Sequence, residues 1–343
     1  MTAKTKDDAV FEEISRFHEL ADYVIPLTLR AICDLHIADL LRDGPGSVDE
    51  LAAETGTQAE PLCRALRALA ARGIFTEPAD RMFAMTPMAE FMRADHPLSL
   101  RDGYPLLPAD LQAWAQADWS LRTGRSAFEQ VHGRPYYRHL DHDIDYRERF
   151  IRSCEAQNRI VLRSLAPAYE WSQCGTIVDV AGGNGAFIAG LLAWNPMLRG
   201  VVFDLPHVVT NAPAVLAAAD VAQRCIVVGG DFFDAMPQGY DTYLLKTVLH
   251  DWTDERAAVL LKSLVRAMRP DSRLLVLEAL IPPGNDYHVG KLLDLNSLVL
   301  AGGVDRTEQE LRDLLESAGL KVTRLIPTSS LAILEARSAR QEK

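Results

Sequence analysis

Several polar residues that could bind a ligand or catalyse a reaction follow apolar, strand-like runs in the second half of the chain. Asp179 interrupts the first of these runs and leads into a loop of small residues at 181–185. The later runs lead to Asp204, Asp231, Phe232, Lys246, His250, Asp251 and Glu278. Because the carboxyl ends of parallel strands meet at one edge of a sheet, we expect these side chains to share one site. Packing alone does not explain polar residues at nearly every strand end.

The residue types at these strand ends indicate a nucleoside ligand without phosphates. The dinucleotide pattern GxGxxG fails, because Ile188 stands where the third glycine belongs, and no GxxxxGK[ST] run is present. Asp204 suits a pair of ribose hydroxyls, since a carboxylate accepts from both. Asp231 suits an adenine amino group, and Phe232 suits the face of the ring. S-adenosylmethionine is the candidate that fits these features.

Alternating strand-like and helix-like stretches predict the fold that positions this site. The helical stretches include 186–194, 207–219 and 254–268, and a capping box at Thr307 opens another helix. Such alternation is typical of a mostly parallel sheet covered on both faces. The last two strands follow each other closely, so we expect an antiparallel edge. The predicted strands are 176–180, 200–203, 225–228, 241–245, 273–277, 321–326 and 331–335.

The first hundred residues predict helices followed by a hairpin. Residues 10–41 carry apolar side chains at helical spacing, with a break or kink at Pro26. Capping boxes that begin at Ser47 and Thr57 predict two further helices, and the stretch 74–86 predicts a hairpin. Two helices and a hairpin in this order are a winged-helix pattern, which serves DNA binding or dimerisation.

The charge balance favours dimerisation. The chain has 36 basic and 47 acidic residues among 343, a net charge of −11, which disfavours nucleic acid and anionic membranes as partners. The candidate recognition helix at 58–72 has three arginines on a largely alanine and leucine surface. We therefore expect this surface to bury against a second subunit, and keep a DNA-binding sensor as an alternative.

Composition indicates a cytoplasmic globular protein. Five scattered cysteines without a CxxC pair predict reduced, mostly buried thiols, and we see neither a signal peptide nor a membrane span. Residues 101–170 are predicted to be helical and rich in aromatic residues, which either line a pocket or fill a core. The run from His139 to Asp143 has a metal-binding composition, but neighbours on an irregular segment rarely converge on one ion.

Four motifs, in this order, resemble those of S-adenosylmethionine-dependent small-molecule O-methyltransferases, a family of plant caffeate and flavonoid enzymes and bacterial natural-product enzymes. They are Asp-Val-Ala-Gly-Gly-Asn-Gly at 179–185, Phe-Asp-Leu-Pro-His at 203–207, Gly-Asp-Phe-Phe at 230–233 and Leu-His-Asp-Trp at 249–252. The segment from Asp305 to Glu308 resembles the family's glutamate-arginine-threonine segment.

The resemblance covers nearly the whole chain and implies its organisation. A winged-helix-like homodimerisation domain would span 1–100, and a helical connection contributing to the substrate pocket would span 101–170. A Rossmann-like class I methyltransferase domain, an α/β fold, would span 171–343. The implied reaction is metal-free methylation of a phenolic hydroxyl on a small aromatic metabolite. The implied cofactor-binding residues are Arg147, Ala181, Gly182, Gly183, Gly185, Asp204, Asp231, Phe232 and Lys246.

By the same resemblance His250 is the general base, and Glu278 and Asp305 support it. A phenol with a pKa of about 10 is mostly protonated at neutral pH, and histidine, at about 6.5, is a suitable acceptor. A carboxylate on the other ring nitrogen would set the tautomer, and Glu278 stands at the end of an adjoining strand. We expect Asp251 to point away and cap the helix that begins at Thr253.

Two departures and one rival reaction follow from the resemblance. Asp305 is shorter than the family's glutamate, which would leave a gap to the histidine or make room for a larger substrate. Ala181 stands where the family has its first glycine; if its φ is positive, Ala181→Gly should bind cofactor more tightly. Some relatives use the bound sulfonium for hydroxylation, decarboxylation or cyclisation, although an intact His250 argues against this.

Overall fold

The computed structural model describes residues 6–105 and 107–339, and the chain forms two compact units. The first unit is Met1–Leu106 and the second is Leu107–Lys343. The helical segment that follows residue 106 therefore belongs to the second unit, which contains the seven-stranded sheet. Among the described residues, no helix combines the length and apolarity that crossing a membrane requires.

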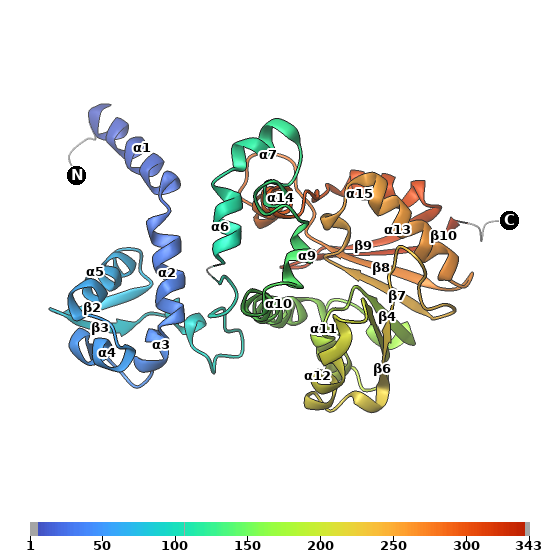
Figure 1. Cartoon of the computed structure of the whole chain (residues 1–343), viewed down its shortest axis with the longest axis horizontal. Coiled ribbons are helices and arrows are strands. Elements are labelled where there is room, and N and C mark those ends of the chain that lie inside the picture. The colour runs from blue at the N-terminus through green and yellow to red at the C-terminus, as the bar shows by residue number, and fades with distance from the viewer. Residues whose placement is uncertain (1–5, 106, 340–343) are drawn as a thin grey trace. The chain divides into compact units, whose positions relative to one another are not determined.

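The first unit has the two-helix and hairpin arrangement that the sequence predicts (Figure 1). Its strands pair in the order β1-β3-β2. The core is apolar and includes Ile37, Leu66 and Phe83, all fully buried. The elements are α1 (Lys6–Ala21), α2 (Val24–Asp34), α3 (Ile37–Leu40), β1 (Gly46–Ser47), α4 (Val48–Thr55), α5 (Ala59–Ala70), β2 (Phe75–Ala79), β3 (Met82–Met85) and the short 3₁₀ helix η1 (Ala89–Met92).

Two local predictions in this unit were wrong. The first helix ends before Asp22, whose carboxylate accepts hydrogen bonds from the amides of Val24 and Ile25. Pro26 instead lies in the first turn of α2, where its missing N–H has no intrahelical partner to lose. The capping box at Ser47 is confirmed, whereas α5 begins after Gln58 and has no side-chain cap, so the box at Thr57 is absent.

The second unit begins with short helices that pack against a later helix of the same unit. Phe128, Tyr136 and Tyr146 form a buried cluster with Leu300, and the Ser126 hydroxyl donates to the Leu300 carbonyl at 2.7 Å. Many of the aromatic residues predicted for this region thus fill a core. The elements are α6 (Pro108–Trp114), α7 (Ala117–Thr123), α8 (Ala127–His132), α9 (Tyr136–Leu140), α10 (Ile144–Leu165), the 3₁₀ helix η2 (Trp171–Cys174) and, later in the chain, α14 (Val289–Leu300).

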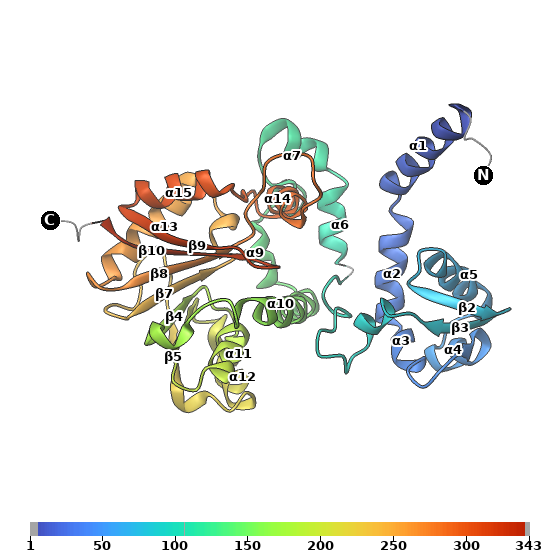
Figure 2. The same cartoon turned by 180° about the vertical axis from the view of Figure 1, so that it is seen from behind.

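The seven-stranded sheet has the order β6-β5-β4-β7-β8-β10-β9, with five parallel strands and an antiparallel edge, as predicted. Successive residues face opposite sides, so Ile177 packs with α10, α11 and α12 while Val178 packs with α13 and α15 (Figures 1 and 2). The strands are β4 (Thr176–Val180), β5 (Arg199–Asp204), β6 (Cys225–Gly229), β7 (Thr242–Lys246), β8 (Arg273–Glu278), β9 (Leu320–Ile326) and β10 (Ala332–Ser338). The covering helices are α11 (Ala186–Trp194), α12 (Ala212–Ala218), α13 (Asp254–Ala267) and α15 (Glu308–Ser317), with 3₁₀ turns η3 (Val209–Asn211), η4 (Ala222–Arg224) and η5 (Leu249–Asp251).

Candidate active site

The small-residue loop between β4 and α11 lies at the carboxyl edge of the parallel strands. The Gly183 amide donates to Asp204 Oδ2 at 2.9 Å, which ties the loop to the end of β5. Gly183 and Gly185 have φ of +60° and +79°, and a Cβ on Gly185 would press on Val202. A Cβ on Gly183 would meet no atom within 4 Å. The loop thus presents bare backbone to an open space, as a site for close approach of a ligand requires.

Two residues without the freedom of glycine adopt left-handed backbone at this edge. Ala181 has φ of +60°, and Thr247, directly after β7, has φ of +51°. The left-handed region costs an L-residue about 1–2 kcal/mol and is rare for a β-branched one. The positive φ that makes Ala181 a costly replacement for glycine is therefore present. Such strain concentrates where a site dictates the backbone.

The residues expected to hold ribose and adenine follow β5 and β6. The Asp204 carboxylate also accepts from the Leu205 amide at 2.7 Å, and burial raises its pKa. Asp231 Oδ1 accepts from the Phe233 amide at 2.8 Å, and the half-buried Phe232 packs against Phe233. The backbone therefore holds both carboxylates in fixed orientations.

A buried acid and a lysine lie beneath the loop. Asp179 is only 2% exposed, and its Oδ2 atom has no hydrogen-bond partner among the described residues. Burial raises the pKa of Asp179 to about 7, against the opposing effect of Lys246. Lys246 Nζ hydrogen-bonds the Thr247 hydroxyl at 3.1 Å and lies over the ring of Phe187. An orphaned buried carboxylate oxygen beside open backbone is suited to a ligand's polar group.

His250 lies in η5, with a carboxylate facing each nitrogen of its ring. Nδ1 is 3.4 Å from Asp305 Oδ1, and Nε2 is 3.4 Å from Asp251 Oδ1. Asp305 therefore reaches the ring despite its shorter side chain. The expectation that Asp251 points away and caps the next helix was wrong: the Thr253 N-cap has no side-chain hydrogen bond. Burial lowers the pKa of His250, but Asp251, Glu278 and Asp305 together raise it to about 10.

The segment that carries His250 is fixed from two later parts of the chain. Glu278 Oε1 accepts from the amides of Val248 and Leu249 at 3.1 and 2.9 Å. The buried Arg306 donates to the carbonyls of Leu249 and Trp252, on either side of the histidine. Glu278 thus acts on the ring through its charge while its hydrogen bonds hold the backbone.

The backbone at Gly303 and Val304 lies in close contact with the backbone of His250. The Val304 amide donates to the His250 carbonyl at 2.8 Å, and a Cβ on Gly303 would overlap that carbonyl oxygen. Sequence reasoning did not identify Gly303 or Arg306 as site residues. The resemblance of 305–308 to a family segment was the one signal available for Arg306.

Helix α10 contributes further residues near the loop. The Asn184 side chain donates to Glu155 Oε1 at 2.7 Å, which ties α10 to the loop. Cys154, one turn from Phe150, is solvent accessible, yet desolvation raises the pKa of its thiol to about 11, with Lys246 acting in the opposite direction. Arg147 lies two turns earlier, half-buried, and its guanidinium has no ion pair within the described part of the chain. The other four cysteines are buried, as predicted.

The cluster of His250, Glu278 and Asp305 has donor atoms that also suit a metal ion, but these atoms are engaged with the imidazole ring and the backbone. One donor atom each from His250, Glu278 and Asp305 lie within 4.8 Å of one another. Both ring nitrogens already face carboxylates, and Glu278 Oε1 accepts from two amides, so we assign the cluster to the imidazole. The other metal-like run diverges, since Asp141 pairs with His207 while the ring of His139 packs against Phe128.

Comparison with known proteins assigns both units. Residues 114–321 match the model of the O-methyltransferase domain, and residues 18–95 match the O-methyltransferase dimerisation domain. The chain is 36% identical to a phenazine O-methyltransferase of Lysobacter antibioticus, over 98% of this chain and 99% of the relative.

Two further relatives show the range of chemistry on this fold. A methyltransferase of calicheamicin biosynthesis, solved with S-adenosylhomocysteine bound, is 33% identical and has a TM-score of 0.85 over 98% of this chain and 100% of that one. The aclacinomycin 10-hydroxylase of Streptomyces purpurascens is 34% identical, over 88% of this chain and 82% of the relative.

Proposed function

This chain belongs to the S-adenosylmethionine-dependent O-methyltransferase family, and from that premise we propose that it methylates a phenolic hydroxyl of a small aromatic natural product. The observation that carries the proposal is His250, whose Nδ1 faces a buried carboxylate while the ring remains 20% accessible. A histidine oriented in this way can take a proton from an acceptor hydroxyl. The phenazine enzyme, similar over nearly its whole length, supports a polycyclic aromatic acceptor.

The residues at the strand ends fit this cofactor. Asp204 would hold the ribose, Asp231 and Phe232 the adenine, and the loop 181–185 with Lys246 and Arg147 the methionine part. Support comes from the orphaned Asp179 oxygen, the open space at Gly183 and the absence of a phosphate-binding pattern. When bound, S-adenosylmethionine supplies an activated methyl group. The protein must then position the acceptor oxygen in line with that methyl group and remove its proton.

The test is turnover with labelled cofactor and a panel of hydroxyphenazines, phenolic acids, hydroxyquinones and polyketide scaffolds. We expect at least one acceptor to gain the labelled methyl group, with one S-adenosylhomocysteine formed per product. Tight cofactor binding without transfer to any oxygen acceptor would contradict the proposal. Incorporation into an amine instead would change the acceptor class.

A second candidate reaction is favoured by one relative, the 10-hydroxylase. In that case the cofactor would be bound without donating its methyl group. Product formation without S-adenosylhomocysteine would favour this reaction. The accessible imidazole beside a fixed carboxylate supports methylation instead, because a non-methylating site has less need of a base.

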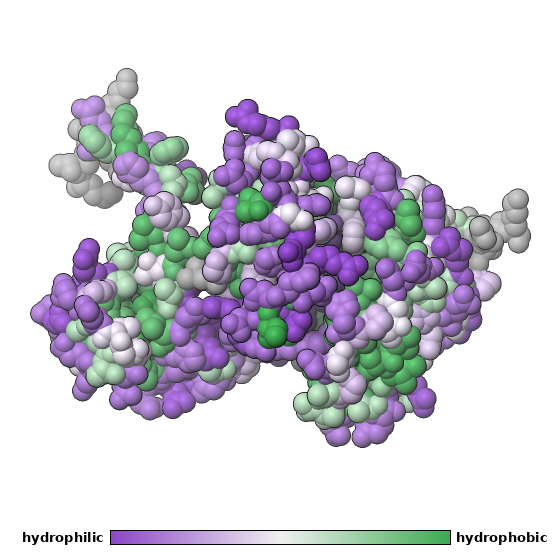
Figure 3. Space-filling view, in the orientation of Figure 1, coloured by the Kyte–Doolittle hydropathy of each residue, from purple (hydrophilic) through white to green (hydrophobic). Residues whose placement is uncertain are grey.

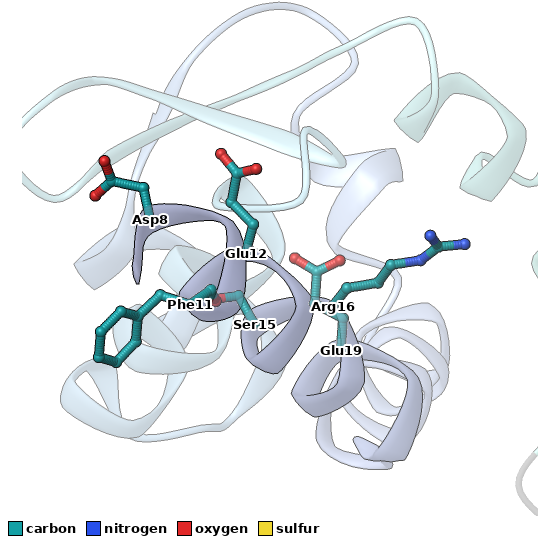
Figure 4. Close-up of a pocket in the computed structure, with 6 residues that line it drawn as sticks. All are labelled: Asp8, Phe11, Glu12, Ser15, Arg16 and Glu19. Carbon is teal, nitrogen blue, oxygen red and sulfur yellow. The ribbon is translucent and has the colours of Figure 1, made fainter. Parts of the chain in front are cut away.

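We further propose that α1 and α2 form part of a homodimer interface. The apolar side chains exposed on them include Phe11, Ile14, Phe17, Leu20, Tyr23 and Val24. Figure 3 shows apolar surface over these helices, and Figure 4 shows Phe11 projecting from α1 beside polar and charged side chains of the same helix. A surface of this kind needs a partner. Light scattering should give twice the chain mass, and a monomer at micromolar concentration would contradict the interface.

Neither nucleic acid nor membrane has a place in this proposal. Arg67 of the predicted recognition helix pairs with Glu77 and Asp80, and Arg72 pairs with Glu19. Guanidiniums engaged in this way are poorly available to phosphates. The five free cysteines support a reducing cytoplasmic location.

A further inference from the structure

The surroundings of His250 raise a question about proton transfer. A general base needs one unprotonated nitrogen directed at the acceptor hydroxyl. Here Asp305 faces Nδ1 and Asp251 faces Nε2, each at 3.4 Å. A ring between two carboxylates is stabilised with a proton on each nitrogen, which is the form that cannot accept another. One of the two carboxylates must therefore move away from its ring nitrogen before the ring can act as a base.

The two carboxylates differ in their freedom to move. The Asp305 side chain is 1% exposed, its Oδ2 accepts from the Ser297 hydroxyl at 2.9 Å, and its amide donates to Asp294. The Asp251 side chain is 15% exposed and has the hydroxyl of Tyr137, on α9, as a neighbour. Asp305 is thus held in place by hydrogen bonds, whereas Asp251 can turn from the ring toward the Tyr137 hydroxyl. This difference identifies Nε2 as the nitrogen that faces the acceptor.

We propose that Asp251 is a displaceable latch on Nε2 and that Tyr137 holds the latch when the acceptor arrives. Both are positioning residues, and their role rests on the proposed function. In the free enzyme Asp251 pairs with the protonated ring. When the acceptor binds, the Nε2 proton passes to the Asp251 carboxylate, which turns to the Tyr137 hydroxyl, and the acceptor hydroxyl takes the vacated place at Nε2.

The proton count of this sequence balances. The ring is then neutral, with its remaining proton on Nδ1 toward Asp305. As the acceptor oxygen forms its bond to the methyl group, its O–H bond breaks and that proton passes to Nε2. The proton on Asp251 leaves to solvent with product release, which restores the pair. Burial already raises the pKa of Asp251, which favours its brief protonation.

Other ionisable groups surround the latch and must be kept constant in any test. They come from α9, α10 and the ends of β7 and β8, and from the segment after α14: Tyr136, Tyr137, Cys154, Lys246, Glu278 and Asp305. Substitutions should therefore preserve shape. Asp251→Asn and Tyr137→Phe do so, and Tyr287→Phe, at an exposed tyrosine remote in sequence from the pair, is the matched control.

The first measurement is the pKa of His250 in the intact protein, by NMR of histidine-labelled enzyme assigned with His250→Asn. Asp251→Asn should lower this pKa by about one unit or more, because the imidazolium loses a neighbouring carboxylate. Tyr137→Phe should raise it by about half a unit, because Asp251 then bonds the ring alone. Tyr287→Phe should leave it unchanged. This readout needs no turnover, so it stays informative if the proposed reaction is wrong.

The second measurement combines Asp251→Asn and Tyr137→Phe in one double mutant and adds steady-state kinetics. If Tyr137 acts through Asp251, Tyr137→Phe should have no further effect on the pKa, or on the acid limb of kcat/KM, once Asp251 is Asn. Two results would overturn the latch: an unchanged His250 pKa in Asp251→Asn, or additive effects of the two substitutions. If Tyr137→Phe raises KM but leaves the acid limb of kcat/KM at the same pH, Tyr137 contacts the acceptor directly.

Discussion

The proposed cofactor side and the proposed proton-transfer side of this site are built in different ways. On the proposed cofactor side, most groups stand at the ends of strands, and Asp231 is held by nearby backbone, the Phe233 amide. On the proton-transfer side, His250 depends on Glu278, Gly303 and Arg306, which lie 28 to 56 residues further along the chain. The first side follows from local chain order, while the second exists only when distant segments pack.

Removal of the base should separate the two sides most clearly. We expect His250→Ala to lower kcat by about a hundredfold or more, because the proposed general base is then missing. Cofactor affinity, measured by calorimetric titration, should stay within about twofold, since the strand-end groups are unchanged. Methylation at the wild-type rate would contradict the assignment of His250.

A methyl group behind the histidine should have nearly as large an effect. Gly303→Ala would push its Cβ into the His250 carbonyl oxygen, so the segment that carries the base must shift. We expect at least a tenfold loss of kcat, because misplacement by about 1 Å can cost far more than that. Gly239→Ala is the control: its Cβ meets open space at φ of +79°, so it should cost about 1 kcal/mol of stability and no activity.

Two substitutions at Glu278 should distinguish its hydrogen bonds from its charge. Glu278→Ala leaves the buried amides of Val248 and Leu249 without an acceptor, which should cost about 2 kcal/mol or more in the free energy of unfolding. Glu278→Gln keeps an acceptor oxygen and should cost less than about half of that. It should also lower the pKa of His250, which a carboxylate raises. Equal denaturation midpoints for both variants would argue against the backbone role.

The smallest effect should come from the cofactor loop. Ala181→Gly removes the strain of an alanine in the left-handed region and should stabilise the protein by up to about 1 kcal/mol. The greater conformational entropy that glycine gives the unfolded chain opposes part of this gain. Cofactor should bind a few-fold more tightly if the methyl group also crowds the site. Thermal unfolding and titration would measure the two effects separately. No gain in either would mean that the surrounding loop already accommodates the alanine.

Residue order alone predicted much of the fold and the meeting of the strand-end residues at one edge of the sheet. Apolar runs of period two between amphipathic helices dictate a covered parallel sheet, and the polar residues after Val180, Phe203 and Val228 must then meet at one edge. Failures were local. The first helix breaks at Asp22, and α5 starts without a side-chain cap. Both outcomes depend on which of several nearby polar groups makes a hydrogen bond to the backbone, and the residue pattern does not determine that choice.

Only the tertiary structure decided which acid faces which nitrogen of His250. The sequence placed Glu278 near the ring and turned Asp251 away, but the fold directs Asp305 to Nδ1 and Asp251 to Nε2. Tyr137 joins them from a helix more than a hundred residues earlier. Side-chain direction in an irregular turn depends on the contacts of its backbone, here with Glu278, Val304 and Arg306, and those contacts are absent until the chain has folded.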